Sequence, residues 1–136
     1  MKKIKSIPVS RGVCGVFLLL MTVVILNSCS KDYTGVAPVD PNVPVSFSEQ
    51  IIPIFTASCA TASTCHKPGG HVPDLTPTHA YDELLGLGYV DSTNAAGSKL
   101  YTIINASSNY MPKDGKLSGD KISLIFNWIK QGAQNN

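Results

Sequence analysis

The apolar residues of the chain fall into two patterns, separated by a stretch that has no pattern. Residues 12–26 form one unbroken apolar run, which follows a basic stretch at residues 2–11. Residues 30–45 show no helical period and hold three prolines, which is typical of an extended spacer. From Ser46 onward, apolar residues recur at helical spacing in several short segments. The pattern therefore predicts an apolar leader, a spacer and one helical domain.

The first predicted helix begins at Ser46. Ser46 and Glu49 have the spacing of a capping box, with a hydroxyl at the cap and a carboxylate three residues later. The apolar face that follows runs toward Cys59 and consists of Ile51, Ile52, Ile54 and Phe55. Pro53 lies within this segment, so the helix is expected to kink or restart there.

Two further short helices are predicted in the middle of the domain. Thr76-Pro77 is expected to open one of them, with proline at the first helical position, and Gly86 or Gly88 to end it. Ser98 is expected to cap the next helix. The apolar residues of that helix are Leu100, Tyr101, Ile103 and Ile104.

The C-terminal helix has the clearest pattern. Ser118 is expected to cap it, Leu117 and Ile122 to form a hydrophobic staple, and Gly132 to end it. Its apolar residues form a broad helical stripe that includes Trp128. No segment alternates apolar and polar residues for long enough to predict a strand. The expected fold class is all-α, with about four short helices joined by long loops.

The loops of this domain are long for its size. Residues 60–75 and 105–117 have almost no periodicity, yet they contain Cys65, His66 and Met111. A domain of about 90 residues buries a modest core, which does not by itself order so much irregular backbone. Such a domain usually needs a disulfide, a metal or a cofactor, so we expect one of these among the loops.

The N-terminal 28 residues resemble a bacterial lipoprotein signal peptide. The apolar run is 15 residues long, which is shorter than the roughly 20 that span a bilayer and typical of a signal-peptide core. It ends in Leu26-Asn27-Ser28-Cys29, which is similar to a lipobox, where the cysteine receives the lipid and becomes the first residue. The alternative is a single-pass membrane anchor in which Cys29 is incidental.

This resemblance divides the chain into a signal peptide (1–28), a proline-rich tether (29–45) and a folded domain (46–136). Several acyl chains on Cys29 would attach the protein stably to membrane lipid. Ser30 follows the cysteine, at the position where aspartate commonly signals retention in an inner membrane. The expected location is therefore the cell envelope, lipid-anchored, with the outer membrane favoured.

The charge of the mature chain argues against nucleic acid as a partner. The sequence holds 11 Lys+Arg against 9 Asp+Glu, but four of the basic residues lie within residues 2–11. Residues 29–136 keep 7 lysines and 9 acids, a net charge of −2, and no arginine follows Arg11. Because phosphate recognition favours bidentate arginine, nucleic-acid binding is not expected.

Cys59, Cys65 and His66 form the chemistry-bearing motif of the domain. A haem c attachment site ends in Cys-His, although its usual form is Cys-x-x-Cys-His and five residues separate the cysteines here. In such a site two thiols add to the haem vinyl groups and the histidine reaches the iron; a longer loop can bulge outward and still place both sulfurs. One alternative is a disulfide, which exported proteins readily form. The other is a zinc site made by these three residues and His71.

The order of motifs along the domain resembles that of the small c-type cytochrome domain with histidine and methionine as axial ligands. More narrowly, it is similar to the bacterial surface-lipoprotein branch of that family. The matching segments, which span residues 46–136, are Ile52 to Phe55, Cys59 to His66, Ser98 to Ile103, Met111-Pro112 and Trp128 to Asn135. The fold that this resemblance implies is class I cytochrome c-like, with short helices and long loops around a haem.

The resemblance implies a role for each site residue. Cys59 and Cys65 would form thioethers, and the long spacing leaves open a single thioether through Cys65. His66 would be the proximal ligand, and Met111 the distal ligand on a loop stiffened by Pro112. A thioether is a soft, neutral ligand that raises the reduction potential. The side chains expected to wall the haem are Phe55, Tyr101, Trp128 and the isoleucines.

The implied function is that of a membrane-tethered monohaem c-type cytochrome. Such a protein holds one covalent haem c, carries single electrons between redox partner proteins and is not an enzyme. The alternative is a surface binding module without haem, stapled by a disulfide or by zinc. A third reading is a haem sensor whose iron lacks Met111 and binds a small ligand.

Replacing Cys29 with serine tests the lipid anchor. Because the cysteine thiol accepts the lipid, Cys29→Ser is expected to abolish lipidation and to release or mislocalise the protein. Membrane fractionation and intact-mass measurement check this. Partition with membrane at full yield and unchanged mass would refute lipidation at Cys29.

Overall fold

The computed structural model describes residues 40–136 of the chain. The predicted signal peptide, the predicted lipidation site at Cys29 and the predicted tether up to residue 39 lie outside the described residues. No helix within residues 40–136 has the length and the apolar content needed to cross a bilayer.

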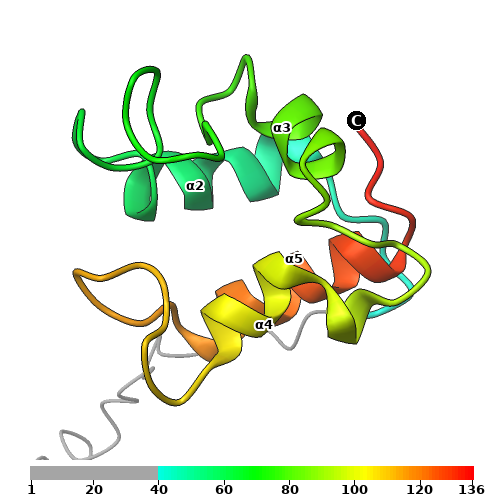
Figure 1. Ribbon diagram of the computed structural model, residues 1–136. Coiled ribbons are helices and arrows are strands. Elements are labelled where there is room, and N and C mark those ends of the chain that lie inside the picture. The colour runs from blue at the N-terminus through cyan, green and yellow to red at the C-terminus, as the bar shows by residue number, and fades with distance from the viewer. Residues whose placement is uncertain (1–39) are drawn as a thin grey trace, which may run out of the picture. The chain divides into compact units, whose positions relative to one another are not determined.

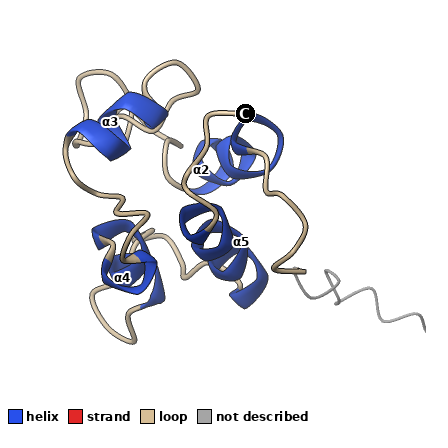
Figure 2. Cartoon of the chain, turned by 90° about the vertical axis from the view of Figure 1, so that its right-hand side faces the viewer, coloured by secondary structure: helices blue, strands red, loops and turns tan. Residues whose placement is uncertain are grey.

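The described part of the chain consists of helices and loops, as Figure 1 and Figure 2 show. Residues 40–136 contain no β-strand, so the predicted all-α class is confirmed for this part. The elements in chain order are η1 (Phe47–Ile51), α2 (Ile52–Ser58), α3 (Ala80–Gly86), η2 (Ala95–Gly97), α4 (Lys99–Asn105) and α5 (Gly119–Lys130). The longest loops join α2 to α3 and α4 to α5, where the sequence lacks periodicity.

The first helix divides at Ile52, beside Pro53, where the sequence predicted a kink or a restart. The Ser46 hydroxyl accepts from the Glu49 amide at 3.2 Å, which is one half of the predicted capping box. The other half is made by Gln50, whose Oε1 accepts from the Ser46 amide at 2.9 Å. Residues 47–51 form a π-helical turn, and α2 then begins with proline in its first turn. Proline is tolerated there because an amide in the first turn has no partner within its own helix.

The second helix begins later than predicted. Residues 77–79 form a turn, and α3 starts at Ala80 and ends at Gly86, the earlier of the two predicted ends. The carboxylate of Asp74 accepts from the amide and the hydroxyl of Thr76, at 2.9 and 2.7 Å. This local bonding competes with helical geometry, and the prediction from the Thr-Pro pair did not include it.

The caps of α4 and α5 were predicted at the right positions but with the wrong bonds. Ser98 and Ser118 are the N-cap residues, and neither side chain bonds to the helix that follows. The Ser98 hydroxyl instead accepts from the Asp91 amide at 2.9 Å and donates to the Asp91 carbonyl at 3.1 Å. Gly132 follows the end of α5 as predicted, with a φ of 100° that glycine adopts without strain.

Four aromatic rings form the centre of the core. The ring of Phe47 stacks on Trp128 at 4.9 Å and meets Phe55 and Tyr81 edge to face at 6.5 and 5.4 Å. Trp128 is 1% exposed, and its indole N–H donates to the Gln134 carbonyl at 2.9 Å. Because buried aromatic side chains remove large apolar areas from water, this aromatic core cluster fixes α5 against η1 and α2.

The beginning of the described chain is bonded to the segment after α5. The side chain of Gln131 donates to the carbonyls of Pro41 and Val43 and accepts from the Val45 amide, at 3.1, 2.9 and 2.8 Å. Val45 is 4% exposed and belongs to the core. Residues 41–45, which the sequence pattern assigned to the tether, are therefore packed on the domain.

Candidate functional site

All four side chains that the sequence singled out for cofactor binding line one pocket. Cys59, Cys65, His66 and Met111 border a cavity of about 430 Å³. This volume lies within the range of small-molecule and cofactor sites. Its lining includes Ser58 and Cys59 at the C-terminal end of α2 and residues of both long loops. Figure 1 shows these two loops near that end of α2.

The rest of the pocket lining is mostly apolar. The apolar lining residues are Val72, Pro73, Leu75, Tyr89, Leu100, Ile103, Ile104 and Pro112. The polar ones are Ser58, Thr64, His71, Lys113 and Asp114. Val72 and Ile103 are 67% and 40% exposed, so part of the rim of the pocket is apolar and open to solvent. The pocket therefore suits a largely apolar ligand that keeps one edge exposed.

Three side chains expected to wall the pocket do not line it. Phe55 and Trp128 belong to the aromatic core cluster, and Tyr101 packs against Phe126 with ring centroids 4.6 Å apart. Tyr89 is the aromatic side chain that lines the pocket instead. Helical periodicity marks a residue as buried but does not distinguish the core from a pocket wall. Tyr89 lies outside every helix, so no periodic signal marked it.

The segment from Cys59 to His66 forms a closed loop at the end of α2. The Cys59 amide donates to the Phe55 carbonyl at 2.8 Å, so this cysteine extends the last helical turn. The His66 amide donates to the Cys59 carbonyl at 3.2 Å, which joins the two ends of the loop. Residues 61–64 between them are exposed. The additional residues of the Cys-x5-Cys spacing thus bulge outward, while both cysteines remain at the pocket.

Gly70 allows the next part of the loop to fold back on the cysteines. Its amide donates to the Lys67 carbonyl, and the His71 amide donates to the Cys65 carbonyl, both at 2.8 Å. A Cβ on residue 70 would lie 2.1 Å from the Cys65 carbonyl oxygen and 2.7 Å from that of Ser63. Only glycine permits so close an approach of two backbone segments.

The ring of His66 is oriented by a hydrogen bond to the backbone. Its Nδ1 lies 2.9 Å from the carbonyl oxygen of Pro73. A carbonyl only accepts, so Nδ1 carries the proton and Nε2 of the neutral ring keeps a free lone pair. Metal-binding histidines are typically oriented by a bond of this kind on the nitrogen that does not bind the metal. His66 can therefore bind a metal through Nε2.

A polar cluster behind the histidine fixes the segment that contains Pro73. The Asp74 amide donates to the Glu83 carboxylate of α3. Burial raises the pKa of Asp74, but hydrogen bonds from Thr76 and the nearby His79 outweigh it and hold the pKa below its usual value. Asp74 pairs with His79 at 3.1 Å. His79 is exposed, as expected, and belongs to this cluster instead of the pocket.

Met111 reaches the pocket from the opposite loop. Its amide donates to the Ile103 carbonyl of α4 at 3.3 Å, and Pro112 beside it is buried. The thioether is a soft, neutral donor of the type that binds iron in haem proteins. Imidazole and thioether, the two ligand types predicted from the sequence, thus border one cavity although they come from different loops.

Both cysteines are free thiols, so the structure does not contain the alternative disulfide. Burial and, to a smaller extent, the charge of Cys65 raise the pKa of the Cys59 thiol to about 11, although the charge of Lys121 opposes them. Within residues 40–136, no three His, Cys, Asp or Glu side chains gather closely enough to hold a metal ion. The alternative zinc site of the two cysteines with His66 and His71 is therefore not formed.

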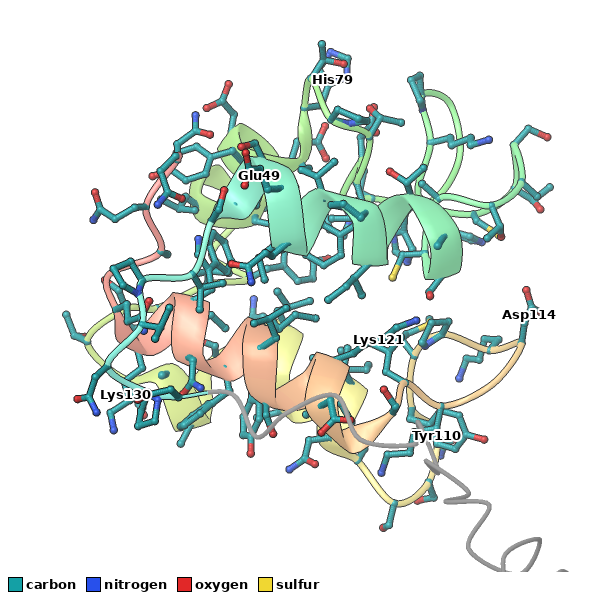
Figure 3. The ribbon with its side chains drawn as sticks, turned by 180° about the vertical axis from the view of Figure 1, so that it is seen from behind. Glu49, His79, Tyr110, Asp114, Lys121 and Lys130 are labelled. Carbon is teal, nitrogen blue, oxygen red and sulfur yellow. The ribbon has the colours of Figure 1, made fainter. Side chains whose placement is uncertain are left out.

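Positive charge gathers around the pocket. Lys113 lines the pocket, and three more lysines adjoin its lining residues: Lys67 follows His66, Lys99 lies 5.7 Å from the ring centroid of Tyr89, and Lys121 lies near Cys59. Among the carboxylates, Asp114 lines the pocket and the buried Asp74 lies between the lining residues Pro73 and Leu75. Figure 3 shows Lys121 and Asp114 toward one end of the domain and Lys130 at the other. Lysines are thus concentrated beside the pocket, although the described chain as a whole carries −2.

Comparisons with known proteins do not assign the chain to a family. No family model, no curated protein and no solved structure matches it. Any functional conclusion therefore depends on the pocket and the residues that border it.

Gly70→Ala tests the close approach that shapes the cysteine–histidine loop. The added methyl group would collide with two backbone carbonyls, which do not rotate away as side chains do. We expect the free energy of unfolding, measured by urea denaturation, to fall by about 1–3 kcal/mol.

Gly86→Ala is the matched control, because a Cβ on that residue of α3 would have no atom within 4 Å. Its effect is expected to stay within about 0.5 kcal/mol. Equal losses of stability in the two variants would contradict the close approach at residue 70.

Proposed function

We propose that the protein is a membrane-tethered monohaem c-type cytochrome that carries single electrons. One observation supports this above all. His66, Met111 and two free cysteines border the same apolar pocket, although the methionine comes from a distant part of the sequence. The proposal includes one covalent haem c and a class I cytochrome c-like arrangement of the helices and loops around it.

The residues at the pocket fit such a group. His66 would bind iron through Nε2, because its Nδ1 is already bonded to the Pro73 carbonyl. Met111 would bind through its sulfur from the other loop. Cys59 and Cys65 have no disulfide partner, and both border the cavity, which favours two thioethers over one. Haem, when bound, supplies reversible one-electron chemistry.

The chain itself would set the conditions for electron transfer. The hydrogen bond to Pro73 keeps the imidazole in one tautomer and one orientation. The neutral sulfur of Met111 favours the reduced state of iron and so raises the potential. Apolar lining excludes water, and the exposed rim at Val72 and Ile103 leaves an edge through which electrons can pass. A carrier of this kind transforms no substrate of its own.

The other functions that the sequence allows have less support. A disulfide-stapled module requires a bond between Cys59 and Cys65, which are free thiols here. A zinc-stapled module requires a compact set of ligands, which residues 40–136 do not contain. A sensor with an open sixth position requires Met111 to lie away from the pocket, and the methionine borders it.

The proposed redox partner has an acidic surface. The lysines at the pocket and beside its lining residues attract such a surface and speed the encounter. The proposed location is the cell envelope, through lipid on Cys29, with the outer membrane favoured.

Expression together with a haem-attachment system is expected to give a red protein that retains its haem after acid–organic extraction. Oxidised protein is expected to show the weak long-wavelength absorption of a methionine–Fe(III) bond.

Met111→Ala is expected to remove this band and lower the potential while the haem stays attached, because the thioethers remain. His66→Ala is expected to leave little correctly assembled holoprotein.

His79→Ala is the matched control for the histidine, because His79 is exposed and does not line the pocket. Unlike His66→Ala, this variant is expected to assemble holoprotein that keeps the methionine–Fe(III) band, because Asp74 retains its bonds to Thr76 and Glu83. Protein without iron or covalent haem after such expression would overturn the proposed function. Ready binding of carbon monoxide to the unmutated reduced protein would favour the sensor instead.

Lys113→Glu tests whether charge at the pocket controls electron exchange. The rate of oxidation by hexacyanoferrate(III), measured by stopped flow at low ionic strength, is expected to fall several-fold because the reagent is anionic. The difference is expected to vanish at high salt, where charges are screened. Lys130→Glu makes the same charge change at the far end of the domain and is expected to have little effect (Figure 3). Equal effects of the two variants would contradict a local role of the pocket charge.

A further inference from the structure

We propose that Lys116 is a positioning residue that closes the loop carrying Met111 and so keeps the thioether at the pocket. The proposal rests on the function proposed above, which makes Met111 an iron ligand. The ammonium group of Lys116 donates to the carbonyls of Asn105 and Ala106, at 3.1 and 2.8 Å. These residues begin the loop and Lys116 ends it, so the two bonds tie one end to the other.

The place at which Lys116 binds strengthens the closure. The last carbonyls of a helix lack partners within it, and the helix dipole adds partial negative charge there. The C-terminal end of α4 offers such carbonyls, and one ammonium group bonds two of them. The same group lies 5.9 Å from the ring centroid of Tyr110, the neighbour of Met111.

Few other bonds hold this loop. Among the described residues, residues 107–114 make one hydrogen bond to the rest of the domain, from the Met111 amide to the Ile103 carbonyl at 3.3 Å. The Gly115 amide bonds within the loop, to the Pro112 carbonyl at 3.4 Å. Met111 is partly exposed, so packing alone does not fix its side chain. The bonds of Lys116 therefore supply much of the constraint on the methionine.

With a haem bound, this constraint would determine how well Met111 competes with other ligands for the iron. A ligand on a closed loop has a high effective concentration at its site, and that concentration falls when the loop opens. Without the bonds of Lys116, a small ligand from solution would displace the methionine more easily. Lys116 would thus favour binding of the iron by Met111 over binding by a small ligand from solution, as an electron carrier requires.

Lys116→Met removes the ammonium group and keeps a side chain of similar length. The oxidised holoprotein is titrated with imidazole, and loss of the methionine–Fe(III) band reports displacement of Met111. We expect half-displacement at an imidazole concentration about tenfold lower than in the unmutated protein, the effect of losing hydrogen bonds from a charged group. Lys116→Arg is expected to restore most of the original resistance. Lys130→Met, in the last turn of α5, is the matched control and is expected to titrate unchanged.

An unchanged imidazole titration in Lys116→Met would overturn the proposal, even if urea denaturation showed lower stability. In that case Lys116 would be a helix cap with no effect on the methionine. An equal shift in Lys130→Met would overturn it as well. If the unmutated protein takes up no haem, the proposed function has failed, and backbone nitrogen relaxation of residues 107–114 tests the loop alone. Greater mobility in Lys116→Met than in Lys130→Met supports the closure, and equal mobility overturns it.

Discussion

The hydrogen bonds of His66 are the constraint on which the pocket depends. Its amide donates to the Cys59 carbonyl, its own carbonyl accepts from the Leu75 amide, and its Nδ1 donates to the Pro73 carbonyl. The first bond closes the loop between Cys59 and His66. The other two hold residues 73–75, which precede α3, against that loop. Irregular backbone is costly to order and must satisfy its polar groups somewhere. His66 thus joins its own segment to Cys59 and to residues 73–75, and the bond from Nδ1 also orients its ring.

The aromatic core cluster explains why the pocket lies at one end of the domain. Phe47, Phe55 and Trp128 fill the space between α2 and α5, so that part of the interior is closely packed. Beyond Cys59 the helix ends, and loops with few large buried side chains replace it. An apolar cavity left empty lacks packing partners on one side and lowers stability. A fold with an apolar cavity of about 430 Å³ is therefore stabilised by an apolar group that fills it.

The sequence could predict those parts of the fold that depend on near neighbours. The Ser46 cap and the Gly132 end lie where they were expected, because each depends on bonds within a single turn. Predictions failed where the partner is remote: the Ser98 hydroxyl bonds to the preceding loop, and Tyr101 packs against Phe126 instead of lining the pocket. The four site residues could be chosen because each is a chemically distinctive side chain in a loop. Nothing in the sequence marks the carbonyl of Pro73 as the hydrogen-bond partner of His66, so this role could be recognised only in the folded chain.

The unusual cysteine spacing shows where the chain can be lengthened without moving the site. The common haem c motif has two residues between its cysteines, and this one has five. In the structure, residues 61–64 are exposed, and a bond of 3.0 Å from the Cys65 amide to the Ala62 carbonyl forms a turn within them. The added length is thus taken up in solvent, while both thiols still border the pocket. Closing a somewhat longer loop costs little additional entropy, because that cost grows only slowly with length. The departure from the common motif therefore changes the exposed side of the loop and leaves both thiols at the pocket.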